Sequence, residues 1–163
     1  MTDRDDVTLD ELYREVVLDH HRQPRGRAPL ARVDATARGF NPVCGDEVQL
    51  EVAMDGDRIE AVRVDGRGCA ICTASGSIMA EMLPGETAVQ ACRQAEAFRT
   101  VMRGGEPDGE LDLGDLEALE GVKRFPVRVK CAMLPWVTLK DALRAWSDGD
   151  AAQLCTTEEE HRA

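Results

Sequence analysis

Residues 47–64 read EVQLEVAMDGDRIEAVRV, and the expected fold follows from this stretch. Over residues 47–54 apolar and polar side chains alternate, which is the period-2 pattern of a strand with one buried face. Asp55-Gly56-Asp57 is a strong turn signal, and apolar residues return over 59–64. We therefore predict an antiparallel hairpin, with residues 33–40 as a third strand.

Helical patterns flank this hairpin on both sides. A Thr8–Glu11 capping box precedes apolar residues at helical spacing, which predicts a helix over residues 9–22. After the hairpin, the same spacing predicts a helix that ends at Pro84-Gly85, a second over residues 88–102, and a last one over about residues 132–146. This order indicates an α+β domain, in which a small three-stranded antiparallel sheet packs against helices.

Three further predictions concern the second half of the chain. Residues 106–120 contain seven acidic residues and no basic one, so we expect an exposed loop with one short helical turn. A proline is tolerated in the first turn of a helix, so Pro135 indicates that the last helix begins close before it, at Cys131. Residues 1–146 then form a single domain, and the acidic residues 147–163 form a flexible tail.

Composition and charge exclude several classes of function. The 163 residues suit one domain, and 20 basic against 31 acidic residues give a net charge of −11. This charge argues against nucleic-acid and anionic-membrane partners. No apolar run approaches the ~18 residues of a membrane span, and residues 1–6 lack the apolar segment of a signal peptide. We expect a cytoplasmic protein. The basic stretch 22–38, with five arginines and one acid, is either a solvated loop or a docking arm for an acidic surface.

Cysteines carry the chemistry of this sequence. Structural disulfides are rare in the cytoplasm, so metal binding or redox chemistry is expected instead. Three thiols lie where predicted elements end, and one carboxylate follows the first thiol by two residues. Three thiols and a carboxylate suit zinc, although their spacing matches no short zinc-finger pattern. The thiols are Cys44, Cys69 and Cys131 and the carboxylate is Asp46. The other cysteines are Cys72, Cys92 and Cys155.

The segment Cys69-Ala70-Ile71-Cys72 is a C-x-x-C motif ahead of a helix. A helix N-terminus lowers a thiol pKa, so this motif could be redox active or supply two metal ligands. It lacks the βαβ setting of a thioredoxin-like site, and Cys72 could instead be a small buried residue. Cys92 lies on an apolar helix face and is predicted to be core, and Cys155 is incidental in the tail. Neighbouring His20 and His21 cannot share one helix face, so they form no metal-binding pair.

At its cysteine motifs the sequence resembles the IscU-like sulfur-assembly family. Residues 41–46 (NPVCGD), 66–71 (GRGCAI) and 128–132 (RVKCA) resemble its three ligand motifs in order. Residues 12–26 resemble its first helix and following loop, and the resemblance extends over residues 7–146. The family resemblance implies an IscU/SufU-like fold.

Two features place the resemblance in the SufU branch of this family. The scaffold branch usually has a histidine before the last cysteine, where this chain has Lys130. The SufU branch also carries an insertion before that cysteine, which residues 111–122 resemble. The proline-rich chaperone-recognition motif of the scaffold branch is replaced here by residues 125–128, FPVR.

The SufU resemblance implies a zinc ion bound by Cys44, Asp46, Cys69 and Cys131. It implies that the protein accepts persulfide sulfur from a SufS-type cysteine desulfurase and passes it to downstream iron–sulfur assembly proteins. In the family, a desulfurase histidine replaces one zinc ligand and frees the first cysteine, here Cys44, to attack the persulfide. Arg128 is our candidate for a positioning cation beside these ligands, the alternative being an ordinary surface arginine.

Other interpretations of the same residues stay open. An iron–sulfur cluster could assemble transiently on the same cysteines, as on a scaffold, and thiolates can hold either metal. Cys69 and Cys72 could form a dithiol oxidoreductase, or the zinc could stabilise an inert binding module. The family usually has a small residue such as serine in place of Cys72. We favour a silent replacement there, over a resolving thiol or a spare zinc ligand.

Overall fold

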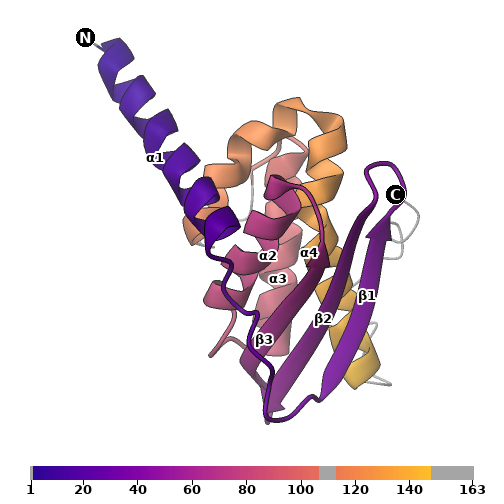
Figure 1. Ribbon diagram of the computed structural model, residues 1–163. Coiled ribbons are helices and arrows are strands. Elements are labelled where there is room, and N and C mark those ends of the chain that lie inside the picture. Colours follow the sequence, from indigo (N-terminus) through magenta and orange to yellow (C-terminus); the bar gives the residue numbers. More distant parts are fainter. Residues whose placement is uncertain (1, 107–112, 148–163) are drawn as a thin grey trace.

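The computed structural model describes residues 2–106 and 113–147, with side chains from residue 11 onward. Four α-helices, three strands and one 3₁₀ helix make up this part of the chain (Figure 1). In chain order they are α1 (Thr2–Arg22), β1 (Ala35–Asn41), β2 (Asp46–Asp55), β3 (Arg58–Arg67), α2 (Ala70–Met82), α3 (Ala88–Met102), η1 (Gly114–Arg124) and α4 (Pro126–Ser147).

The strands form one antiparallel sheet in the order β1-β2-β3, which confirms the predicted sheet and hairpin. Asp55 pairs with Arg58, so Gly56 and Asp57 make a two-residue turn, and Gly56 has the positive φ of 63° that such a turn requires. At the opposite end of the sheet, Asn41 pairs with Asp46. The β1–β2 turn therefore lies at the same end as the exit of β3.

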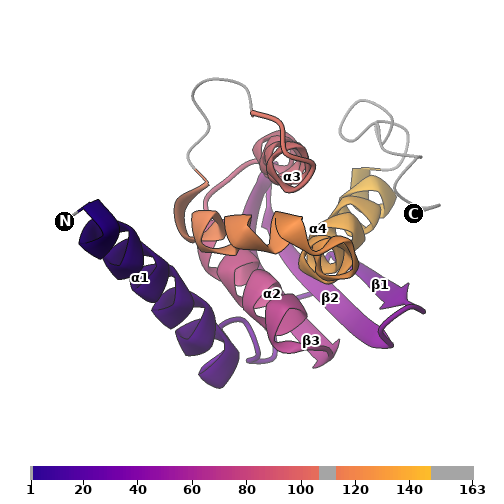
Figure 2. The same ribbon diagram turned by 90° about the horizontal axis from the view of Figure 1, so that it is seen from above.

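The helices cover one face of this sheet (Figures 1 and 2). α4 packs on β1 and β2, α2 packs on β3, and α1 and α3 pack against α2 and α4 respectively. Along β2, buried apolar residues that face the helices alternate with more exposed residues. Leu50, Ile78 and Trp136 are fully buried between the sheet and the helices. Gly39 allows the close approach of α4, because a Cβ there would lie 2.0 Å from Thr138 Oγ1. Burial of this shared apolar surface drives the fold.

The first helix is longer than its sequence pattern predicts. It begins at Thr2 rather than at residue 9, and its N-terminal half extends beyond the other helices (Figure 1). Acidic residues favour the N-terminal turns of a helix, and the sequence has aspartates at positions 3, 5 and 6. The capping box at Thr8 therefore did not mark the beginning of this helix.

Residues 106–120 were predicted to be an exposed loop with one short helical turn; residues 107–112 lie outside the described residues, and the helical part is longer and more buried than predicted. Residues 114–124 form the 3₁₀ helix η1, which packs against all four α-helices except for its acidic outer side. Leu116 and Leu119 are buried, and their spacing of three residues matches the 3₁₀ period, which places both on one face. The density of acidic residues concealed this apolar pair.

The predicted beginning of the last helix is also wrong. α4 begins at Pro126, the first-turn position that suits proline, and Pro135 lies inside the helix. An interior proline costs about 3 kcal/mol, and the burial of Trp136, Leu139 and their neighbours offsets this cost. Cys131 therefore lies within the helix rather than at its beginning.

Only the first residue of the predicted C-terminal tail lies within the described part of the chain. Ser147 is the last residue of α4, and the remainder of the predicted tail, residues 148–163 with Cys155, lies outside the described residues. In the described part of the chain, no helix combines the length and the apolar character needed to cross a membrane.

Candidate metal centre

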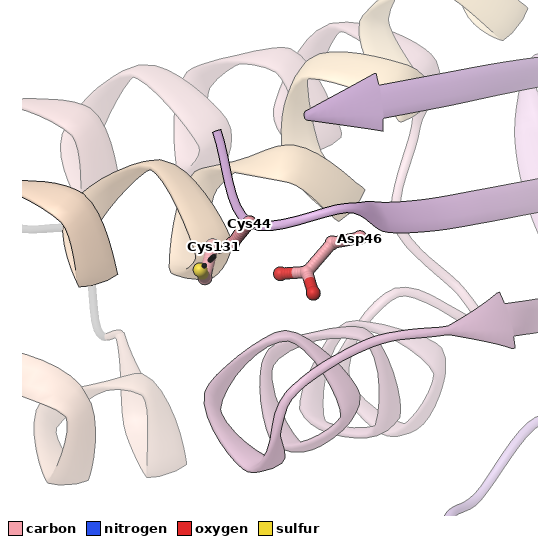
Figure 3. A group of neighbouring side chains, drawn as sticks. All are labelled: Cys44, Asp46 and Cys131. Carbon is pink, nitrogen blue, oxygen red and sulfur yellow. Dashed lines mark hydrogen bonds between the residues drawn. The ribbon is translucent and has the colours of Figure 1, made fainter. Parts of the chain in front are cut away.

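Four predicted ligand residues meet at one end of the sheet. Cys44 lies in the β1–β2 turn, Asp46 begins β2, Cys69 is the N-cap residue of α2, and Cys131 projects from α4. One sulfur or oxygen atom each from Cys44, Asp46 and Cys131 lies within 4.8 Å of the others (Figure 3). Cys69 Sγ lies beside this group, 3.7 Å from Asp46 Oδ2.

The β1–β2 turn holds Cys44 against the helix layer. Cys44 Sγ lies 3.2 Å from Cys131 Sγ, and Asn41 Nδ2 donates a hydrogen bond to Cys44 Sγ over 3.1 Å. The Asn41 carboxamide also accepts the Val43 N–H, so it is fixed within the turn. Sequence reasoning did not assign Asn41 a role. The signal available in the sequence was its position directly before the Pro-Val-Cys turn. In the structure, Asn41 pairs with Asp46.

Asp46 is a buried carboxylate with no ionic partner of its own. Its side chain is 3% exposed, and Oδ1 accepts the Cys69 N–H over 3.1 Å. Among the residues whose side chains are described, none forms a salt bridge with it. A buried carboxylate is costly unless a positive charge accompanies it. The described side chains therefore give Asp46 no paired cation, and a bound metal ion would supply one.

Cys131 is the most deeply buried of the ligand candidates. Burial raises the pKa of its thiol, and hydrogen bonding with Cys44, Asp46 and Cys69 raises it further. The proton on such a thiol is replaced when a metal ion binds, because thiolate is the metal ligand. Three thiols and one carboxylate form a donor set that zinc accepts in tetrahedral geometry. The residues therefore fit a zinc ion.

Arg128 lies beside these ligands, in the first turns of α4. Its side chain hydrogen-bonds to Cys69, and this bond together with the negative charge of the Cys69 and Cys131 thiolates raises the pKa of Arg128. The guanidinium is exposed at the rim of the site. Lys130 is also close to Cys131 in sequence, but it lines a cleft with Phe40 and Pro42 beside β1.

Neither Cys72 nor Cys92 belongs to this group, and Cys155 lies outside the described residues. Cys72 is buried below Gly68, where a Cβ would approach its sulfur to 3.0 Å. Burial, with the negative charge of Asp46, raises the pKa of the Cys72 thiol. Cys92 is buried in α3, which confirms its prediction as a core residue.

Exposed apolar side chains lie close in the chain to Cys44 and Cys131. Val43 is 62% exposed next to Cys44, and Phe40 is 58% exposed at the end of β1. Phe125 and Val127, before Cys131 in the chain, are 60% and 50% exposed. Large exposed apolar side chains near a site are typical of a surface that contacts another protein.

The basic stretch 22–38 is largely neutralised within the chain. Arg25 pairs with Asp19, Arg27 with Asp65, and Arg32 with Asp34, at 2.7, 3.2 and 3.0 Å. These contacts favour the interpretation of a solvated loop over that of a docking arm, because three of its five arginines already have acidic partners.

Residues 12–132 match the family model described as NifU-like N terminal domain. The chain belongs to this family. The zinc-dependent sulfurtransferase SufU of Bacillus subtilis is 38% identical over 88% of this chain and 97% of its own. The iron–sulfur cluster assembly scaffold protein IscU of Streptococcus pyogenes is 39% identical over 83% of this chain and 85% of its own.

Solved structures of the family share this architecture. The crystal structure of FiSufU, a SUF-system protein of Fervidobacterium islandicum AW-1, superimposes with a TM-score of 0.72 at 36% identity. It covers 79% of this chain and 94% of its own. The sequence-based prediction of a SufU-type member with an α+β fold is thereby confirmed.

Proposed function

We propose that this protein is a zinc-dependent sulfur acceptor in iron–sulfur cluster assembly. It takes persulfide sulfur from a SufS-type cysteine desulfurase and passes it to downstream assembly proteins. One observation carries the proposal: three thiols meet a buried carboxylate that forms no salt bridge among the described side chains. The similarity to a protein named as a zinc-dependent sulfurtransferase supports it.

Cys44, Asp46, Cys69 and Cys131 are the residues that would hold the zinc. When bound, zinc supplies the missing positive charge and keeps the thiols deprotonated but capped. Cys69 and Cys131 are fixed on α2 and α4, whereas Cys44 lies on a turn at the surface. Gly45 beside it has a φ of +74° and open space around its Cα. Cys44 is therefore the thiol that can leave the group with the least disturbance.

Sulfur transfer by Cys44 is an exchange between thiolate and persulfide. The Cys44 thiolate attacks the outer sulfur of the desulfurase persulfide, so that a new S–S bond forms on Cys44. The S–S bond on the desulfurase breaks and leaves its cysteine as a thiolate. The sulfane sulfur keeps its oxidation state and its proton, so no external oxidant or reductant is needed. The Asn41 amide, which donates to Cys44 Sγ, stabilises the thiolate before attack.

Arg128 and the exposed apolar side chains near the site would contact the desulfurase. A guanidinium beside Cys69 attracts an incoming persulfide anion and offsets the negative charge of the ligands. Phe40, Val43, Phe125 and Val127 supply the exposed apolar surface against which a partner would pack.

The test is desulfurase turnover with the zinc-loaded protein and two matched cysteine variants. We expect Cys44→Ala to abolish the stimulation of turnover, because the acceptor thiol is lost. Cys72→Ala removes a buried thiol from the same end of the sheet and should keep the stimulation within about twofold. Equal stimulation by Cys44→Ala and the native protein would refute the proposal.

The second candidate function is that of a scaffold for an iron–sulfur cluster on the same cysteines. The similarity to the Streptococcus pyogenes scaffold protein favours it. Anaerobic reconstitution separates the two functions. A stable, transferable cluster that is lost on replacement of Cys69 or Cys131 would support the scaffold, and zinc that survives the treatment would support the sulfur acceptor.

A further inference from the structure

A second group of metal-ligating side chains lies away from the thiols, where α1, α2 and η1 meet. It consists of His20 near the end of α1, Glu81 in α2 and Asp115 in η1. His20 Nε2 lies 3.3 Å from Asp115 Oδ2 and 3.8 Å from Glu81 Oε1. One ligand atom from each residue lies within 4.8 Å of the other two. The three elements that supply them are in mutual contact.

The histidine of this group is held in place by its other ring nitrogen. His20 is 2% exposed, and its Nδ1 lies 2.7 Å from Ser77 Oγ. Ser77 Oγ also accepts the backbone N–H of Arg25, which fixes the hydroxyl. In metal sites, a ligating histidine characteristically bonds through its second nitrogen to a fixed polar group, and this bond sets the direction of the first. The Nε2 atom of His20 is directed toward both carboxylates in this way.

The charge around His20 is unbalanced. Asp19, Glu81 and Asp115 surround the guanidinium of Arg25, which contacts Asp19 at 2.7 Å and Glu81 at 3.4 Å. The positive charge of Arg22 also acts on Asp19. These carboxylates raise the pKa of Arg25, and the hydrogen bond that Arg25 donates to Asp19 raises it most. Set against the guanidiniums of Arg25 and Arg22, these three carboxylates leave an excess of one negative charge. A bound divalent cation would offset that excess.

We propose that His20, Glu81 and Asp115 bind a divalent metal ion at a site separate from the thiols. One imidazole nitrogen and two carboxylate oxygens suit a hard-to-borderline cation such as Mn²⁺ or Fe²⁺, whereas the thiol group suits zinc. Ligand atoms about 2.1 Å from an ion lie roughly 3.0–3.4 Å apart. The His20–Asp115 spacing already matches, and Glu81, which is 49% exposed, can close the remaining gap. Water completes the coordination on the exposed carboxylate side.

This ion would join the three helices through one bond each. The acidic 3₁₀ helix η1 would be tied to α1 and α2 through Asp115, in addition to the burial of Leu116 and Leu119. Metal binding would therefore stabilise the packing of η1 against the rest of the domain.

The test is titration of the zinc-loaded protein with Mn²⁺, followed by loss of the free-ion EPR signal. Mn²⁺ stands low in the Irving–Williams order, so it leaves zinc on the thiols in place. Asp115→Asn keeps an acceptor for the His20 N–H but removes the charge of a ligand. Glu117→Gln makes the same change of charge at an exposed position of η1 and serves as the control.

We expect the native protein and Glu117→Gln to bind one more Mn²⁺ ion per chain than Asp115→Asn, or to bind it at least about tenfold more tightly. Mn²⁺ should also raise the melting temperature of the native protein and not that of Asp115→Asn. Absence of Mn²⁺ binding by the native protein, or equal binding by Asp115→Asn, would overturn the proposal and leave His20 as a structural residue. No desulfurase is present, so the outcome is independent of sulfur transfer.

Discussion

The thiol group and the histidine group differ in how each balances its charge. At the thiol group, buried Asp46 has no salt bridge among the described side chains, and a positive charge must come from a bound ion. At the histidine group, Arg25 already neutralises part of the charge, and the two carboxylates of the group are half exposed to water. The stability of the folded protein should therefore depend much more on a metal ion at the thiol group than on one at the histidine group.

Removal of zinc tests this difference most strongly. An uncompensated buried charge costs about 3–5 kcal/mol, which for a chain of this size lowers the melting temperature by roughly 6–20 °C. We expect this loss when zinc is chelated, measured by calorimetry. In Asp46→Asn, which lacks the buried charge, chelation should lower the melting temperature less. An apo protein that melts within about 2 °C of the zinc form would contradict the contrast.

Ser77→Ala tests the histidine group without touching the thiols. It leaves His20 Nδ1 and the Arg25 N–H without their partner, which costs about 1–3 kcal/mol, or roughly 2–12 °C in melting temperature. Zinc content should not change. Thr73→Ala, one turn earlier on α2, is the control and should lie near the native value. A loss of zinc in Ser77→Ala would show that the two groups are coupled.

Arg128→Ala tests the cation at the rim of the thiol group. We expect about tenfold weaker stimulation of the desulfurase, with zinc content unchanged, because the guanidinium beside Cys69 acts on the incoming sulfur rather than on the fold. Arg124→Ala, an exposed arginine at the end of η1, provides the comparison. Equal stimulation by the two variants would make Arg128 an ordinary surface residue.

The smallest expected effect concerns Asp19, which lies beside the histidine group and pairs with Arg25. The hydrogen bond from Arg25 lowers the pKa of Asp19, so this carboxylate stabilises the fold above the pKa of the unfolded chain, near 3.8. That contribution is lost as the pH falls through the lower pKa of the folded protein. Asp19→Asn should therefore melt slightly below the native protein at pH 7, and the two curves should converge only as the pH falls below the lowered pKa of Asp19 in the folded protein, which is under 3.8. Asp57→Asn in the hairpin turn should show no such convergence.

Local patterns explain which parts of the molecule could be predicted from the sequence. The hairpin followed from alternation and a turn signal within 18 residues, and the ligand motifs lie within short segments. The 3₁₀ helix η1 was missed because its two buried leucines lie among acids. The beginning of α4 was missed because packing around Trp136 overrides the preference of Pro135.

The histidine group could not be predicted because no local pattern encodes it. His20 meets Ser77 and Asp115 across 57 and 95 residues of sequence, through the packing of three elements. Adjacent His20 and His21 suggested no metal pair within the helix, and that prediction took no account of acids distant in the sequence. The acids that complete the group become neighbours only when η1 docks on α1 and α2.

Pro135 interrupts the backbone hydrogen bonding of α4. The residue four positions before it is Cys131, whose carbonyl would receive the N–H that proline lacks. The hydrogen-bond ladder of the helix is therefore interrupted directly after the buried ligand. Buried residues on both sides of this interruption, such as Leu134 and Trp136, belong to the same core, so packing rather than backbone hydrogen bonding holds α4 together at this point.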